Sequence, residues 1–150
     1  MSVPISPIKW AIGPYASSST SSIESYERSL LNNPEYTVVW VNIVKLMQKT
    51  DTTQRLNLTG DGGPNAKKGR VEFLKAIALK GEAMAPADVT ITARGLIGFN
   101  NGRHRILVCY LLGGQKAPII VKLSELDKLG NILEYQEITH FAYFSPKSIK

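Results

Sequence analysis

The sequence predicts a single small α+β domain, in which a small mixed β-sheet is packed against helices. Two observations support this fold class. The chain has 150 residues, an ordinary size for one domain, and 43% of them are apolar, which is enough for one core. Runs rich in β-branched and aromatic residues alternate with two amphipathic segments, as in a sheet covered by helices. We find no internal repeat that would indicate a second domain.

The first residues are expected to form a flexible arm in front of this domain. Residues 1–22 combine early prolines with a run of serine and threonine. Such a segment buries too little apolar surface to offset the entropy lost on ordering it. The alternative is that Trp10 and Tyr15 pack onto the domain, which is expected to cover residues 23–150.

The predicted strands share β-branched residues or an alternation of apolar and polar side chains, and they cover residues 36–44, 88–93, 96–99, 117–123 and 132–138. The longer predicted helices repeat apolar residues every three or four positions, and they cover residues 70–81 and 103–112. Shorter helical segments are expected after the capping-box pair Ser21 and Glu24, at 45–48 and at 124–129. The first four strands should form one mixed sheet on which both longer helices pack.

A long polar loop is expected at residues 50–69, and loops of this length in compact domains are often functional or disordered. Its glycine-rich part, residues 60–65, is not a Walker A loop because no Gly-Lys-Ser/Thr sequence closes it. Lys67, Lys68 and Arg70 follow directly, so the loop remains a candidate cover for a nucleotide.

The positive charge of the chain is concentrated in one segment. The net charge is +6 and the pI is about 9.5. Residues 67–122 hold ten Lys and Arg against three acids, a net of +7, which leaves −1 for the rest of the chain. This balance favours polyanionic partners such as nucleic acid or nucleotides. If nucleic acid binds mainly through its phosphates, affinity should fall steeply with salt and depend little on base sequence.

Cys109 is the only cysteine, so no disulfide can form within the chain, and a reducing, cytoplasmic location is expected. Because Cys109 lies in an apolar helical run, we predict a buried, unreactive thiol. No apolar run reaches the roughly 18 residues of a transmembrane helix, and prolines interrupt the apolar N-terminus, which does not resemble a signal peptide.

The strongest functional signal lies in the strand–turn–helix segment at residues 96–114. A strand runs into Asn100-Asn101-Gly102, and a helix begins at once with Arg103-His104-Arg105. The unpaired N–H groups and the dipole of a helix start attract anions, so cations placed there call for a compensating anion such as phosphate. Gly102 would let the backbone approach that anion closely.

The expected phosphate-binding residues surround this helix start and are Asn101, Gly102, Arg103, His104, Arg105, Lys68 and Arg70. The catalytic candidates are the groups able to move protons or stabilise charge, namely His104, Arg103, Arg105 and Glu72. Asp61 and Glu72 are candidate metal or base residues, or else ordinary solvated acids. No metal ligand set is predicted, since the chain lacks the cysteine and histidine pairs of a zinc site.

A structural role for the same helix start is the alternative. Arg103 and Arg105 would then pair with surface acids, while His104 would cap the helix or pack against it. Because both arginines are expected at the surface, replacing the two with alanine should abolish phosphate binding and leave folding nearly intact.

The run Gly98–Arg105, followed by Leu112-Gly113-Gly114 and Ala117–Val121, resembles the signature of the ParB/sulfiredoxin superfamily. Within it, the chain looks most similar to plasmid fertility-inhibition proteins of the oncogenic-suppression type. These share the Asn-Gly-Arg-His-Arg sequence, a tryptophan-containing strand, here Val39–Val41, and a Gly-Arg pair before a helix, here Gly69-Arg70. The resemblance covers residues 36–123.

The resemblance implies a ParB/sulfiredoxin-like domain in which Arg103, His104 and Arg105 bind a nucleoside triphosphate such as ATP. It also implies ATPase or DNase activity and inhibition of conjugative plasmid transfer. An enzyme of either kind usually needs a metal or a general base, so a divalent metal is a candidate cofactor. Arg103 occupies the position of the sulfiredoxin cysteine, which argues against sulfiredoxin chemistry. Two alternatives are a non-catalytic inhibitor that binds DNA or a component of the conjugation or secretion machinery, and a nuclease toxin domain of the same fold.

Overall fold

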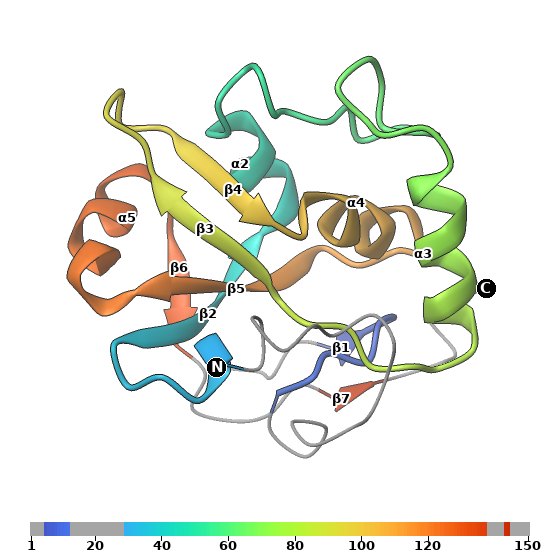
Figure 1. Cartoon of the computed structure of the whole chain (residues 1–150), viewed down its shortest axis with the longest axis horizontal. Helices are drawn as coiled ribbons and strands as arrows, with labels where there is room; N and C mark the ends of the chain where they lie inside the picture. The colour runs from blue at the N-terminus through green and yellow to red at the C-terminus, as the bar shows by residue number, and fades with distance from the viewer. Residues whose placement is uncertain (1–4, 13–28, 138–142, 145–150) are drawn as a thin grey trace.

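The computed structural model describes residues 5–12, 29–137 and 143–144. Its architecture is α+β, which confirms the predicted fold class (Figure 1). A five-stranded mixed sheet has the strand order β4-β3-β5-β2-β6. Its strands are β2 (Tyr36–Asn42), β3 (Ala87–Ile91), β4 (Ile97–Asn101), β5 (Lys116–Lys122) and β6 (Tyr135–Glu137).

The pairing within this sheet is mostly antiparallel. β2 pairs antiparallel with both β5 and β6, and β4 pairs antiparallel with β3, whereas β3 and β5 are parallel. The four strands expected to share a sheet do so, and β6 extends it at one edge. A separate parallel pair joins β1 (Ile5–Ser6) to β7 (Tyr143–Phe144).

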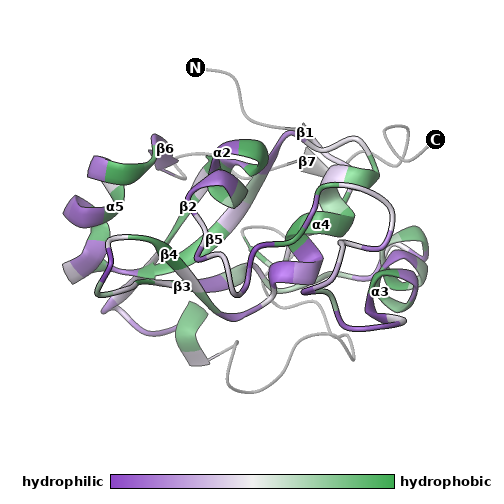
Figure 2. Ribbon diagram, turned by 90° about the horizontal axis from the view of Figure 1, so that it is seen from above, coloured by the Kyte–Doolittle hydropathy of each residue, from purple (hydrophilic) through white to green (hydrophobic). Residues whose placement is uncertain are grey.

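The helices form layers beside the sheet, and they are α2 (Ile43–Gln48), α3 (Arg70–Leu79), α4 (Arg103–Leu111) and α5 (Leu126–Ile132), with a 3-10 turn at Leu123–Glu125. α4 contacts β3 and β5, and α3 packs on α4. Both views place α4 between the strands and α3 (Figures 1 and 2). The expectation that both longer helices pack on the sheet is therefore right for α4, whereas α3 forms an outer layer.

Some element boundaries differ from the predicted ones. The strand predicted over residues 36–44 ends at Asn42, because the Asn42 side chain accepts a hydrogen bond from the Lys45 N–H and starts α2. α5 continues to Ile132, so the last strand begins at Tyr135. β4 continues through Asn101, which lies opposite Asp88, and leaves Gly102 to make the turn into α4.

The segment before the domain contributes to the core. Ile8 and Trp10 are each 1% exposed and belong to the main hydrophobic cluster. The Trp10 indole N–H donates to the Ser6 hydroxyl at 3.0 Å. Residues 5–12 are thus part of the folded domain and not a flexible arm. For Trp10, the alternative that it packs onto the domain is therefore the right one. Tyr15 and the helix start expected at Ser21 and Glu24 lie outside the described residues.

Among the helices of the described chain, α4 has the largest share of buried residues. Figure 2 shows a hydrophilic first turn followed by hydrophobic residues, which pack into the core. Cys109 is fully buried here, as predicted, and burial raises the pKa of its thiol to about 12. Within the described residues, no helix has both the length and the apolar character needed to cross a membrane.

Candidate functional site

The turn into α4 depends on a glycine. Gly102 has φ of +90°, a left-handed conformation, and is the N-cap of α4 without a side-chain capping bond. A Cβ on Gly102 would lie 2.8 Å from the Ala87 Cα and 2.8 Å from Nη2 of Arg105. The residue is therefore fixed by both its backbone conformation and the lack of space, and it places the first turn of α4 against the start of β3.

The first two backbone N–H groups of α4 have no hydrogen-bond acceptor among the described residues. The N–H groups of Arg105 and Ile106 donate to the Gly102 carbonyl at 3.0 and 3.3 Å. Those of Arg103 and His104 make no hydrogen bond within the described part of the chain. Two donors at the positive end of the helix dipole are thus without an acceptor in this part of the chain, which is the arrangement that favours an anion near a helix start.

Arg103 is held in place by the long loop. Its Nη1 donates to the Gln54 carbonyl oxygen at 2.7 Å, and partial burial lowers the pKa of its guanidinium, which stays charged. Gln54 is itself fixed, because its amide donates to the Phe99 carbonyl at 2.9 Å and accepts from the Phe99 N–H at 2.8 Å. The Gln54 side chain thereby pairs with the outer edge of β4 as a backbone strand would.

Gln54 is a site residue that no sequence pattern predicted. It positions Arg103 from 49 residues away along the chain. Nothing in the local sequence distinguishes it from other polar residues of the loop. A signal would have required knowing that β4 is an edge strand, whose N–H and C=O groups need partners.

His104 joins the first turn of α4 to the approach to α3. It is 7% exposed, and its Nε2 accepts a hydrogen bond from the Lys67 backbone N–H at 3.0 Å. This bond requires a neutral ring with its proton on Nδ1. Burial, together with the positive charges of Arg103, Arg70 and Lys67, lowers the pKa of His104 to about 4. His104 is therefore packed between the first turn of α4 and the approach to α3, as the structural alternative for this helix start expected.

Arg105 does not lie at the surface, so that expectation is wrong. It is 5% exposed, and its Nη1 donates to the Ala85 carbonyl at 2.9 Å. The physical reason is the helix itself: two residues correspond to about 200° of rotation, so Arg105 faces the core when Arg103 faces outward. Arg105 therefore anchors α4 to the segment before β3.

The structure brings a set of cations together beside α4. Lys67, Lys68 and Arg70 are exposed and stand at the start of α3, which packs on α4. Every charged group that shifts the pKa of His104 is a cation, namely Arg103, Arg70 or Lys67. The predicted phosphate-binding residues thus form two groups. Lys67, Lys68 and Arg70 are exposed, whereas His104 and Arg105 are buried and hold α4 in position through hydrogen bonds.

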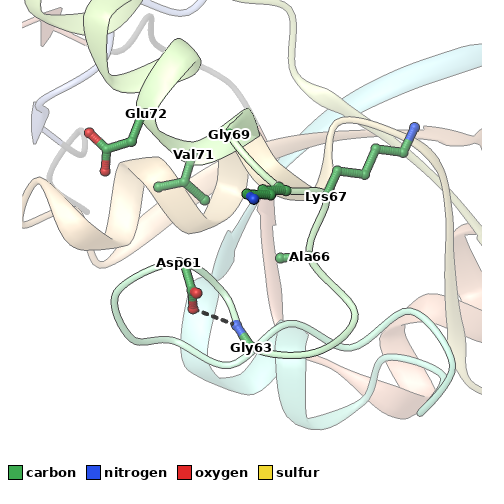
Figure 3. Close-up of a pocket in the computed structure, with 8 residues that line it drawn as sticks. Asp61, Gly63, Ala66, Lys67, Gly69, Val71 and Glu72 are labelled. Carbon is green, nitrogen blue, oxygen red and sulfur yellow. Dashed lines mark hydrogen bonds between the residues drawn. The ribbon is translucent and has the colours of Figure 1, made fainter.

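A pocket of about 180 Å³ adjoins this cluster, lined by Asp61, Gly63, Ala66, Lys67, Lys68, Gly69, Val71 and Glu72. Figure 3 shows the Lys67 side chain extending away from Asp61 and Glu72. Asp61 accepts a hydrogen bond from the Gly63 N–H at 3.1 Å, which shapes the glycine-rich loop. The described residues contain no group of three His, Cys, Asp or Glu placed to hold a metal ion.

Asn101 and Glu72 are the remaining candidates. Asn101 ends β4 and is partly buried, while Glu72 is exposed in the first turn of α3. Glu72 therefore lines the same pocket as Lys67 and Lys68. Comparison of the chain with protein-family models, with curated proteins and with solved structures found no match.

Proposed function

We propose that the first turn of α4 and the residues before α3 bind the phosphate groups of a nucleotide or a nucleic acid. The observation that carries this proposal is the electrostatics around His104, where all the charged groups that act on the ring are positive. Lys67 and Arg70 come from the start of α3, and Arg103 begins α4. A phosphate there would balance the clustered charge and accept hydrogen bonds from two helix starts.

The site combines a fixed half and an adaptable half. The fixed half is Arg103 with the N–H groups of Arg103 and His104, held by Gln54 and by the buried body of α4. The adaptable half is the exposed side chains of Lys67, Lys68 and Arg70. A fixed guanidinium supplies geometry, whereas mobile lysines supply charge to phosphates at variable positions. This division suits a phosphate chain or a nucleic-acid backbone.

The state of His104 favours binding over hydrolysis by this residue. Its Nε2 is occupied by the Lys67 N–H, and its low pKa leaves it neutral and weakly basic at neutral pH. Of the catalytic candidates, Glu72 alone has an exposed carboxylate. A non-catalytic phosphate-binding protein is therefore our leading form of the proposal, and an ATPase or DNase that uses Glu72 is the second.

A divalent cation would fit the second form. Mg²⁺ is commonly held by one or two carboxylates together with substrate phosphates. Asp61 and Glu72 line the same pocket as Lys68, so they could hold such an ion once a phosphate is bound. The ion would neutralise phosphate charge, while the lysines and Arg103 orient the ligand.

Membership of the ParB/sulfiredoxin superfamily belongs to the proposal and rests on the motif at residues 98–105. A cytoplasmic protein that inhibits conjugative plasmid transfer, through DNA or through a component of the conjugation machinery, is the biological role that this resemblance supports. A nuclease toxin domain is the competing role. Toxicity on expression would favour the toxin, whereas reduced plasmid transfer without toxicity would favour the inhibitor.

The test is titration of the chain with ATP and with single-stranded DNA by calorimetry, at several salt concentrations. Arg103→Gln should weaken binding about tenfold or more, the effect of losing one charge-assisted hydrogen bond. DNA affinity should fall steeply as salt rises. Addition of Mg²⁺ and measurement of released phosphate or cleaved DNA then separates the binding form from the catalytic form.

Arg94→Gln is the matched control for this experiment. Arg94 is exposed in the turn between β3 and β4 and belongs to the same basic segment. Its replacement removes one equal charge away from the α4 start, so only a small loss of affinity is expected. Equal losses of affinity in the two variants would mean that binding is general electrostatic attraction and not a specific site at α4. Unchanged affinity in the Arg103→Gln variant would refute the proposed site.

A further inference from the structure

The outer face of α3 is apolar although it is exposed. The inner face of the helix buries four apolar residues in the core. On the opposite face lie Phe73, Ala76 and Leu79, three residues apart, and all three are exposed. Both views place α3 at one side of the molecule, with α4 next to it (Figures 1 and 2). Apolar residues on both faces are typical of a helix that is covered on both sides.

The exposed apolar residues of α3 form one continuous strip. Phe73 and Leu79 are each 57% exposed, which makes them the most exposed large apolar side chains in the described part of the protein. Ala76 lies between them, and residues three apart on a helix are neighbours. Single exposed apolar residues are ordinary on a protein surface, whereas a contiguous strip indicates an interaction surface. We call Phe73, Ala76 and Leu79 the α3 strip.

The charges at the two ends of the α3 strip make it complementary to itself. Glu72 and Lys80 are exposed, and each is four residues from Ala76, so each lies within about 40° of Ala76 around the helix axis. A two-fold rotation at Ala76 brings Glu72 level with Lys80 of a second copy. The same rotation brings Phe73 level with Leu79 of that copy. Each end of such a contact therefore holds one apolar pair and one pair of opposite charges.

Electrostatics favours an antiparallel contact over a parallel one. Parallel helices would bring the basic starts of two α3 helices together and would place Glu72 beside Glu72 and Lys80 beside Lys80. Antiparallel helices keep the basic starts at opposite ends, and the positive end of each helix dipole lies beside the negative end of the other. Arg70 faces about 120° away from Ala76 around the axis, so this contact leaves Arg70 free for phosphate.

We propose that the α3 strip binds the α3 strip of a second copy of this chain, antiparallel across a two-fold axis at Ala76. The small Ala76 side chain lets the two helix axes approach closely. The ten residues of α3 span only about 15 Å, which keeps the buried area well below the roughly 1,200–2,000 Å² of stable interfaces. The dimer is therefore weak, with a dissociation constant on the order of 0.1–1 mM. It is independent of phosphate binding, and either proposal can fail without the other.

The experiment is small-angle X-ray scattering of the full chain between about 10 µM and about 1 mM, a range that brackets this dissociation constant. The mean mass should rise from that of one chain toward that of two. Leu79→Ser should weaken association about tenfold or more, because each dimer loses two buried leucines. Leu123→Ser is the matched control, since Leu123 is 51% exposed outside α3, and it should leave association unchanged. A chain that stays monomeric at about 1 mM, or equal effects of the two variants, would overturn the proposal.

Cross-linking tests the position of the two-fold axis. In Ala76→Cys the new thiol lies beside its own copy, so oxidation with diamide should produce a disulfide-linked dimer, while the buried Cys109 does not compete. Lys128→Cys, at an exposed position of α5, is the control and should cross-link far more slowly. Equal rates for the two variants would contradict an axis at Ala76. Lys80→Glu should weaken association more than Lys128→Glu, and equal effects would refute the pairing of Lys80 with Glu72.

Discussion

The helices α3 and α4 begin in the same way and differ in what surrounds their starts. Each follows a glycine N-cap in the left-handed conformation, Gly69 with φ of +78° and Gly102 with φ of +90°. Each has an arginine as its first residue and no side-chain capping bond. Around a Cβ at Gly69 there is nothing within 4 Å, whereas one at Gly102 would collide with Ala87.

The two arginines differ in the same sense. Arg70 is exposed, and Arg103 is partly buried with its guanidinium on the Gln54 carbonyl. A left-handed glycine followed by arginine therefore specifies a helix start, and the tertiary contacts decide how rigid that start is. For a phosphate site, the start of α4 supplies a preorganised anchor and the start of α3 supplies charge that can adapt.

The largest difference between the two starts should appear on replacing the glycines. Gly102→Ala combines left-handed strain with a Cβ 2.8 Å from the Ala87 backbone, and we expect a loss of about 3–5 kcal/mol in unfolding free energy. Gly69→Ala meets the strain alone and should lose about 1–2 kcal/mol. Urea unfolding of both variants measures this. Equal losses would mean that the packing around Gly102 is unimportant.

The arginines of α4 provide the next largest effect. Arg105→Ala leaves the buried Ala85 carbonyl without its donor and removes a packed side chain, so a loss of about 2–3 kcal/mol is expected. Arg103→Ala should cost less than about 1 kcal/mol, because its side chain is partly exposed. Thermal unfolding followed by circular dichroism tests this order. If the Arg105→Ala variant is well folded but no longer binds phosphate, Arg105 contacts the ligand and does not only support α4.

The hydrogen bond between the Lys67 N–H and His104 Nε2, which joins the starts of α3 and α4, should make stability depend on pH. Burial and the neighbouring cations lower the pKa of His104 to about 4 in the folded protein, from its ordinary value of 6.5. The unfolded chain therefore binds the proton more tightly, and the stability contributed by neutral His104 is complete above pH 6.5. It is lost as the pH falls toward 4, by about 1–2 kcal/mol after allowance for solvent screening.

The measurement is urea unfolding between pH 7 and pH 4, compared with a His104→Gln variant. Glutamine can still accept the Lys67 N–H through its side-chain oxygen but does not titrate in this range. The native chain should lose more stability than the variant over this interval. If the unfolding free energies of the two proteins depend on pH in the same way, protonation of His104 does not contribute to the loss of stability.

The smallest effect concerns the accessibility of the two helices. Cys109 in α4 is fully buried with a pKa of about 12, so a thiol reagent should not label it in the native protein. Phe73 on α3 is 57% exposed, and Phe73→Cys should label readily without much change in stability. Mass spectrometry of the labelled proteins distinguishes the sites. Rapid labelling of Cys109 would indicate that α4 opens in the native state.

The sequence by itself determined the elements of this protein and the location of its basic turn. Alternation and helical spacing identified the main strands and both longer helices, because these patterns follow from local backbone geometry. The glycine–arginine sequence at residues 102–103 was enough to predict a turn directly followed by a helix. The buried state of Cys109 also followed from the apolar residues around it in the helix.

Only the tertiary structure decided which polar side chains face the site. Helical geometry shows that Arg103 and Arg105 diverge, but the position of β3 determines which of them is buried. Gln54 reaches Arg103 across 49 residues, and Lys67 reaches His104 across 37. Contacts at such separations depend on how the loop crosses the edge of the sheet, and short-range periodicity carries no information about that path.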